Sequence, residues 1–206
     1  MAKLKAPLFS LGAAGQLGKA LVYFGWKGLD VVREYVIPAN PNTTAQQTQR
    51  GYLRDAVAAI HAEQALAALP LNADDVTAYS LWASVVQAAT TWFNQMCRHW
   101  IDITIDGKTP AIFREGVSTP GANKIHVTIY CNEINGVDIT AATFFYGTSR
   151  TALIHSVAAG LTPVALLADA DLSPLVTGTK YFWQLRVDTG ENCEGARSGI
   201  YYAKAA

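Results

Sequence analysis

The chain carries Leu175-Val-Thr-Gly-Thr-Lys-Tyr181 immediately before Phe182-Trp-Gln-Leu-Arg-Val187. The first stretch has the small and polar residues of a loop, and the second is rich in aromatic and branched residues that favour β-strands. Similar apolar runs recur at intervals of roughly ten residues, separated by Gly, Asn, Asp, Ser and Thr, which is typical of a β-sandwich. We expect strands over residues 124–131, 138–146, 152–157, 163–167, 180–187 and 199–204.

The part of the chain before Pro110 has a different pattern. Two apolar runs, residues 19–26 and 29–37, flank Lys27-Gly28 and predict a β-hairpin. Helical spacing of apolar residues follows from residue 44 to about residue 69. Asn72 is placed to cap a second helix.

A third apolar stripe at helical spacing runs from Phe93 to Ile101. Beyond it, Ile101, Ile103 and Ile105 alternate with polar residues, which predicts a short strand before the turn at Asp106-Gly107.

These patterns predict an α+β protein with two domains that meet near Lys108-Thr109-Pro110. Residues 1–108 would form a hairpin and helical docking domain, preceded by a Gly-rich arm over residues 1–18. Residues 109–206 would form an antiparallel β-sandwich.

The composition is poor in charge. Hydrophobic residues make up 50% of the 206 residues and charged residues 16%, against roughly 25% in ordinary soluble domains. Charge is depleted where surface is buried against partners, so we expect the protein to form a homo-oligomer or to attach to other proteins. The 16 basic and 16 acidic residues cancel, which argues against direct binding of nucleic acid. We expect no membrane span, because no apolar run approaches the ~20 residues that a span needs.

No catalytic, cofactor-binding or metal-binding pattern emerges, and the chain is predicted not to be an enzyme and to need no cofactor. Gly12-Ala-Ala-Gly-Gln-Leu-Gly-Lys-Ala20 differs from a phosphate-binding loop in its spacing, and Ala20 stands where the loop needs a hydroxyl. The histidines lack the spacing of metal ligands. Three cysteines, Cys97, Cys131 and Cys193, suggest reduced thiols, with a bridge between the last two left open.

Aromatic residues are the remaining signal. Where they are adjacent along a strand, some must point outward, either to cover a neighbouring element or to form an interface. Aromatic platforms also bind sugars, so surface glycans are an alternative partner. The candidate interface residues are Tyr23, Phe24, Trp26, Tyr146 and Trp183.

The loop before Tyr181 resembles that of fibronectin type III domains, which carry Leu-x-Pro-x-Thr-x-Tyr at the start of their sixth strand. Leu175, Thr179 and Tyr181 match, whereas Thr177 replaces the proline. The resemblance covers about residues 110–206 and leaves immunoglobulin-like topologies open. It implies that the tyrosine hydroxyl bonds back to the upstream backbone.

The front of the chain resembles the opening of small proteins of tailed phages and prophages. The matching residues are Val31-Val-Arg-Glu-Tyr-Val-Ile-Pro-Ala-Asn-Pro-Asn-Thr43 and Ala45-Gln-Gln-Thr-Gln-Arg50, within a similarity over roughly residues 15–100. This resemblance implies a virion structural protein, assembled in the host cytoplasm, that decorates the capsid or is associated with the tail or collar. Its partners would be itself and other virion proteins. An adhesin or carbohydrate-binding module that mediates surface attachment is the alternative.

Overall fold

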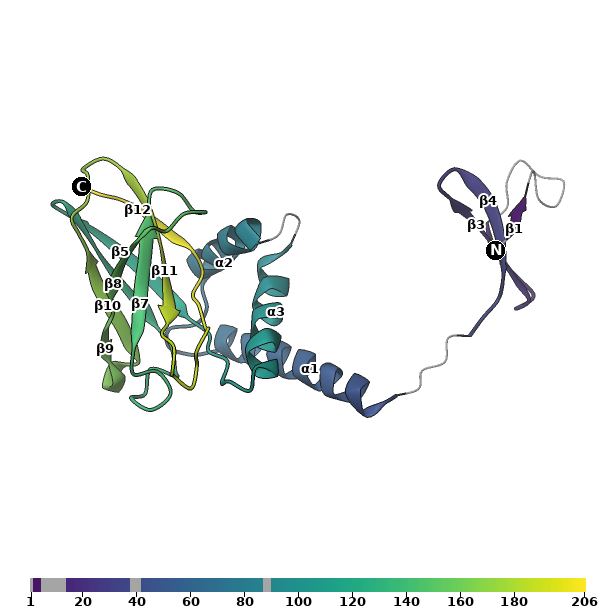
Figure 1. Ribbon diagram of the computed structural model, residues 1–206, viewed down its shortest axis with the longest axis horizontal. Helices are drawn as coiled ribbons and strands as arrows, with labels where there is room; N and C mark the ends of the chain where they lie inside the picture. Colours follow the sequence, from purple (N-terminus) through teal and green to yellow (C-terminus); the bar gives the residue numbers. More distant parts are fainter. Residues whose placement is uncertain (1, 5–13, 38–41, 87–89) are drawn as a thin grey trace. The chain divides into compact units, whose positions relative to one another are not determined.

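The computed structural model (Figure 1) describes residues 2–4, 14–37, 42–86 and 90–206. The chain forms two compact units, Met1–Thr44 and Ala45–Ala206. Helices account for 28% and strands for 34%, and the strands pair antiparallel, which confirms the predicted α+β class. The compact units do not divide at residues 108 and 109 as predicted, because the helices after Thr44 belong to the same unit as the later strands.

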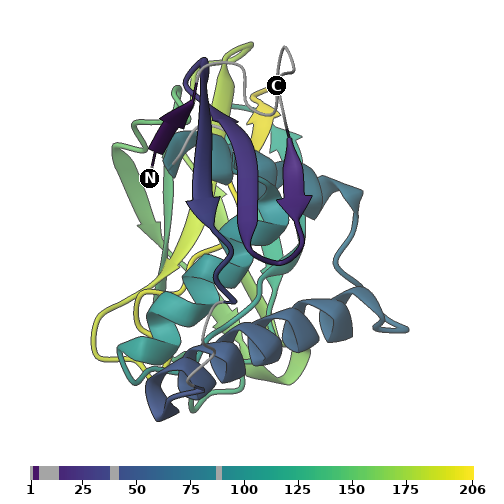
Figure 2. The same cartoon turned by 90° about the vertical axis from the view of Figure 1, so that its right-hand side faces the viewer.

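The first unit is a four-stranded antiparallel sheet in the order β1-β4-β3-β2. Lys27 and Gly28 both have positive φ, 51° and 76°, as the two-residue turn of a tight hairpin requires. This confirms the predicted hairpin, whose strands lie side by side in Figure 2. Two parts of the predicted arm are edge strands, and its residues 5–13 lie outside the described residues. The strands are β1 (Ala2–Leu4), β2 (Gly15–Leu17), β3 (Leu21–Trp26) and β4 (Leu29–Glu34).

The second unit begins with three helices, α1 (Thr44–Gln64), α2 (Ala73–Val86) and α3 (Trp92–Ile105). The helix α1 ends five residues before the predicted residue 69. The chain turns back here, since the Leu71 N–H donates to the Glu63 carbonyl at 3.0 Å.

The cap predicted at Asn72 is confirmed. Asn72 Oδ1 accepts hydrogen bonds from the N–H groups of Asp74 and Asp75 at 2.8 and 2.9 Å. Asp75 Oδ2 accepts in return from the Asn72 N–H at 3.0 Å, so the two side chains satisfy the free N–H groups at the start of α2 reciprocally.

The short strand predicted over residues 101–105 is wrong, because α3 continues through Ile105. Ile103 is buried in the core, whereas Ile105 is 54% exposed. A pattern of only five alternating residues is compatible with a strand and with a helix. The helix forms because it buries Ile103, and the isolated pattern does not reveal this burial.

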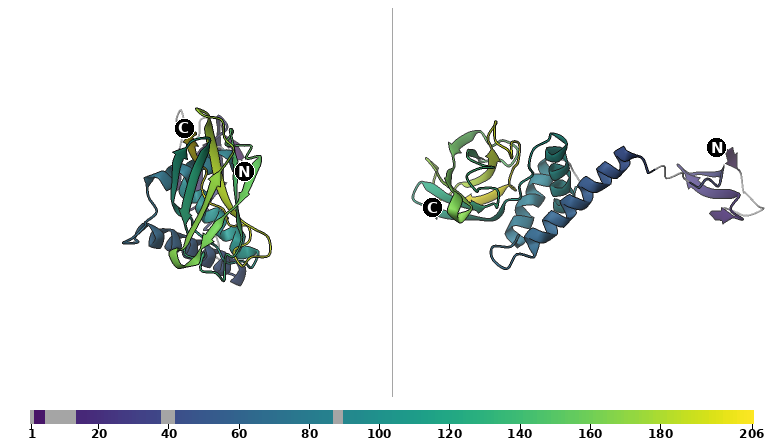
Figure 3. Two further views of the ribbon diagram at one scale, coloured as in Figure 1. Left: turned by 90° about the vertical axis from the view of Figure 1, so that its left-hand side faces the viewer. Right: turned by 90° about the horizontal axis from the view of Figure 1, so that it is seen from below.

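Two four-stranded antiparallel sheets complete the second unit, in the orders β5-β6-β10-β9 and β12-β11-β7-β8. Figure 3 shows the three helices together beside these sheets. The strand expected over residues 163–167 is replaced by a 3₁₀ turn, Pro163–Ala165, that separates two strands. The eight strands are β5 (Arg114–Gly121), β6 (Lys124–Tyr130), β7 (Ala142–Gly147), β8 (His155–Ala158), β9 (Gly160–Thr162), β10 (Leu167–Leu172), β11 (Lys180–Val187) and β12 (Tyr201–Lys204).

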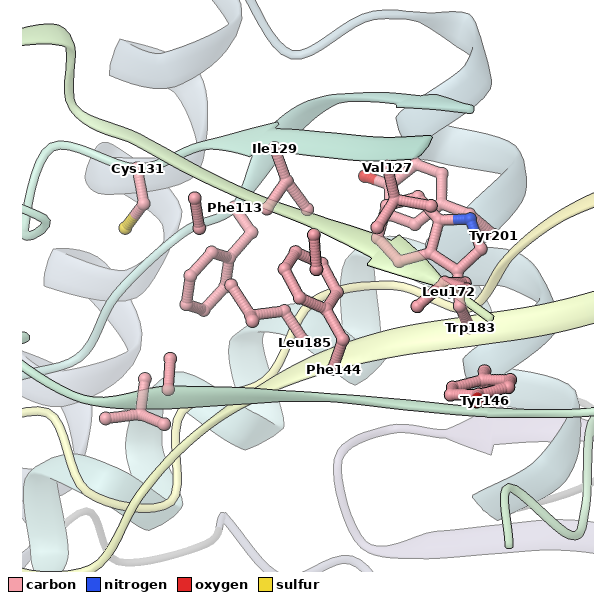
Figure 4. Close-up of a cluster of buried hydrophobic side chains, with 14 of the residues drawn as sticks. Phe113, Val127, Ile129, Cys131, Phe144, Tyr146, Leu172, Trp183, Leu185 and Tyr201 are labelled. Carbon is pink, nitrogen blue, oxygen red and sulfur yellow. The ribbon is translucent and has the colours of Figure 1, made fainter. Parts of the chain in front are cut away.

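Alternate residues of both sheets point into one hydrophobic cluster (Figure 4). In β11, Tyr181, Trp183 and Leu185 are buried, and Phe144 of β7 lies edge-on to Trp183 with ring centroids 5.6 Å apart. A second cluster lies among the helices, with Ile200 and the partly buried Phe182 at its sheet side.

The buried Asp75 carboxylate joins the helices to both sheets. Its oxygens accept hydrogen bonds from the Tyr201 hydroxyl at 2.6 Å, the Glu115 N–H at 2.8 Å and the Gly116 N–H at 3.1 Å. Burial and the nearby Asp75 raise the pKa of Tyr201 well above its ordinary value, so its hydroxyl stays protonated and donates. The helix start, β5 and β12 therefore share one hydrogen-bonding centre.

Replacing Asp75 by alanine tests this centre. We expect Asp75→Ala to lower the free energy of unfolding by about 3–5 kcal/mol, because Tyr201, Glu115 and Gly116 lose a buried acceptor. Urea denaturation followed by circular dichroism measures the loss. The exposed neighbour Asp74→Ala is the control, with an expected loss below about 1 kcal/mol. Equal losses in the two variants would contradict this assignment.

Candidate functional site

The sheet of the first unit has an apolar face. In the β3–β4 pairing Phe24 lies opposite Val31 and Trp26 opposite Leu29, which places these four side chains on one face. We call these residues the hairpin face. Arg33, opposite Val22, lies on the same side, and its guanidinium carbon is 5.5 Å from the centre of the Phe24 ring.

The hairpin face is exposed at one end, where Trp26 and Leu29 lie opposite each other. Val31 is the one buried hydrophobic residue among those described in the first unit, whereas Trp26 is 55% and Leu29 46% exposed. A unit of this size seldom folds stably without metals, disulfides or association. All three cysteines lie in the second unit, so no disulfide can brace the sheet. An apolar face of this kind is typical of a protein interface.

The five predicted interface residues separate into three groups. Phe24 and Trp26 share the hairpin face, while Tyr23 points to the opposite side of the same sheet. Phe24 and Tyr23 are half-buried. The structure therefore brings two of the predicted residues together at an exposed apolar surface.

Tyr146 and Trp183 are core residues, so the prediction that they form an interface is wrong. Trp183 is fully buried, stacks on Tyr201 at a centroid distance of 4.6 Å and donates from Nε1 to Ser118 Oγ at 2.8 Å. Tyr146 is 6% exposed and donates from its hydroxyl to the Ser173 carbonyl at 3.2 Å. Adjacent aromatics in β11 revealed that one must face outward, but the pattern alone did not reveal which.

Two outward aromatics of this sheet, Phe182 and Tyr202, lie opposite each other in β11 and β12. Tyr202 is 50% exposed. The Lys180 ammonium nitrogen lies 3.6 Å from the centre of the Tyr202 ring and 5.1 Å from that of Phe182. The sequence pattern does not reveal this group, since only the pairing of β11 with β12 brings Tyr202 beside Lys180.

His99 is the most perturbed histidine, yet its surroundings are those of a core residue. Burial, and secondarily the charge of Arg197, lower its pKa to about 4. The Trp82 ring meets it edge-on with centroids 4.8 Å apart. The cavity that it lines with Met96 and Ile112 measures about 10 Å³, room for one water molecule and too small for a substrate.

The cysteine thiols are buried and unpaired, which answers the open question of a bridge between Cys131 and Cys193. Burial, aided by the nearby Glu133 carboxylate, raises the pKa of Cys193 to about 12 and that of Cys131 well above its ordinary value. Both thiols stay protonated at neutral pH and are poor nucleophiles.

Within residues 2–4, 14–37, 42–86 and 90–206, no three His, Cys, Asp or Glu side chains are grouped to hold a metal ion. None of the helices in these ranges combines the length and the apolar character that crossing a bilayer requires.

Comparison with known proteins assigns no family: no family model matches the chain, and no curated protein matches it significantly.

The buried imidazole of His99 gives stability a measurable pH dependence. The unfolded chain binds the His99 proton near pH 6.5 and the folded chain only near pH 4, so the free energy of unfolding falls as the pH decreases through this window. Between these pH values, we expect the free energy of unfolding to fall less in His99→Leu than in the unsubstituted chain, by up to about 3 kcal/mol. Urea denaturation at several pH values measures the difference.

His61 is exposed, and His61→Leu is the matched control. Its free energy of unfolding should change with pH in the same way as that of the unsubstituted chain. If the pH profiles of His99→Leu and the unsubstituted chain coincide, His99 is not held neutral by burial.

Proposed function

We propose that this protein is a non-enzymatic structural protein of a tailed-phage virion, which assembles through its N-terminal part and displays a fibronectin type III-like β-sandwich. The hairpin face carries this proposal. Trp26, Leu29 and Phe24 offer apolar area to a partner on a unit that has little core of its own.

The hydrophobic effect explains why such a face would assemble. Burying one large apolar side chain stabilises by about 1.5–3 kcal/mol, and aromatic residues dominate the energetics of interfaces. Closed symmetric oligomers are the usual means by which identical chains cover such surfaces. The proposed partners are therefore further copies of this chain and other virion proteins.

The strand order supports a sandwich of the fibronectin type III or immunoglobulin-like kind. In chain order β5 to β12, the first, second, sixth and fifth strands form one sheet, and the eighth, seventh, third and fourth form the other. Greek-key sandwiches of these families use this arrangement.

Tyr181 supports the resemblance independently. Its hydroxyl oxygen accepts a hydrogen bond from the Val176 N–H at 3.1 Å, five residues upstream, as a tyrosine corner would. Leu175 is buried beside it in the same core. The missing proline at Thr177 leaves this contact intact.

The alternative of a carbohydrate-binding adhesin loses its predicted platform. Tyr146 and Trp183 were the aromatics expected to contact sugars from the sandwich, and both are buried. We therefore propose virion assembly as the function, with display of the sandwich as its consequence.

Substituting Trp26 tests assembly through the hairpin face. We expect the unsubstituted chain to form a discrete oligomer in analytical ultracentrifugation, and Trp26→Ser to weaken its association at least about tenfold through lost apolar burial. Val164→Ser is the control, since Val164 is 99% exposed on the second unit. An unsubstituted chain that remains monomeric at high concentration would refute self-assembly.

Presence in a particle is tested separately. We expect antibodies against the chain to label phage particles induced from a strain that encodes it, at symmetry-related positions in electron micrographs. Particles that form normally and lack the chain would overturn the virion assignment.

A further inference from the structure

Three cations gather on the outer side of β11 and β12. Lys180 lies directly opposite Lys204 in the strand pairing, so both side chains point outward with Phe182 and Tyr202. Arg150, from the turn between β7 and β8, lines the same surface hollow as Lys180 and Tyr202. The hollow encloses about 380 Å³, within the range of ligand sites. We call Arg150, Lys180 and Lys204 the cationic cluster.

The cationic cluster has an electrostatic cost in the isolated chain. Like charges directly opposite in a sheet destabilise it. Within the described residues, no carboxylate forms an ion pair with Arg150, Lys180 or Lys204. Lys124, by contrast, lies 2.7 Å from Asp171. The aromatic rings orient Lys180 without removing its charge, so its N–H donors can still meet an anion.

Beside the cluster, β12 is the edge of its sheet. Ala205 donates its N–H to the Thr179 carbonyl, and hydrogen-bonded pairs alternate along an antiparallel ladder. The N–H and C=O groups of Tyr202 therefore point away from β11. The N–H of Ile200, two residues before Tyr202, also points away from β11, because it donates to the Ala78 carbonyl of α2. No backbone partner for Tyr202 on this open side is found among the described residues.

A groove runs along this open edge. Thr77, Ala78 and Leu81 of α2 form one wall, and Val117 and Ser118 of β5 form the other. The groove and the cationic hollow are adjacent, because Leu81 and Tyr202 line both. An extended chain in the groove would therefore contact the unpaired backbone groups of Tyr202 and, beside them, the positive charge of the cationic cluster.

We propose that the β12 edge binds an extended acidic peptide segment of a partner protein. The segment adds a short strand to β12 through the backbone of Tyr202, and its carboxylates bind the cationic cluster. Strand addition of this type supplies affinity through the main chain and specificity through side chains. An acidic saccharide fits less well, because it cannot pair with an edge strand and Lys180 covers one face of the Tyr202 ring. This site is separate from the hairpin face.

The first experiment titrates the full chain with acetyl-Glu-Val-Glu-Val-Glu-amide and follows backbone amides by NMR. We expect saturable binding that weakens with salt, together with slowed hydrogen exchange at the Tyr202 amide. Lys180→Gln and Arg150→Gln should each weaken binding about threefold to fivefold, because exposed ion pairs contribute modestly. Lys124→Gln, which removes a cation from the other sheet, should leave affinity unchanged.

Two control probes separate strand addition from simple charge attraction. The same peptide with every residue N-methylated, glutamates and valines alike, keeps its carboxylates and loses the N–H donors of its backbone, so it should bind much more weakly. Trigalacturonate offers carboxylates without a peptide backbone. Equal binding of the methylated peptide, binding of trigalacturonate in place of the peptide, or no binding of the acidic peptide would each overturn the proposal. These outcomes do not depend on the oligomeric state, which tests the hairpin face.

Discussion

The second unit depends on the buried Asp75 carboxylate. This side chain, in the first turn of α2, accepts two hydrogen bonds from β5 and one from β12. The two strands belong to different sheets. Two glycines make this approach possible. A Cβ at Gly116 would overlap the Tyr201 ring at 2.3 Å, and one at Gly199 would lie 2.7 Å from the Cβ of Ala78. The helices are therefore an integral part of the second unit, and a cut at residue 108 would leave buried polar groups without partners.

The Glu63–Arg114 ion pair reinforces the same junction. Arg114 Nη1 lies 2.8 Å from Glu63 Oε2, and Arg114 Nε donates to the Leu69 carbonyl at 2.8 Å. Burial raises the pKa of Glu63, although the Arg114 charge acts in the opposite direction. The desolvation cost thus offsets much of the attraction, and the pair contributes orientation between α1 and β5 more than net stability.

Sequence patterns predicted the local elements well where the signal was local. Lys27-Gly28 specifies its turn by backbone conformation, Asn72 specifies a helix start, and Tyr181 specifies a corner. The failures involve tertiary contacts. Ile103 joins a helix because its burial depends on distant strands, and the domain boundary failed because Asp75 and Tyr201 are 126 residues apart in the chain. Only the local part of the candidate sites could be predicted, because the rest also depends on contacts between distant parts of the chain. Trp26 follows from its hairpin, whereas Lys180 and Tyr202 become neighbours only through strand pairing.

The two units differ in the kind of surface that they expose. Among its described residues, the first unit leaves aromatic and aliphatic groups exposed, Trp26 and Leu29 among them. The second unit buries Phe144, Tyr146 and Trp183 in its core and places Lys180 opposite Lys204 at one sheet edge. Contacts between exposed charges weaken as salt screens them, whereas this screening does not weaken apolar contacts. The two surfaces should therefore respond differently to salt, so that added salt would release a partner from the charged edge without weakening contacts at the hairpin face.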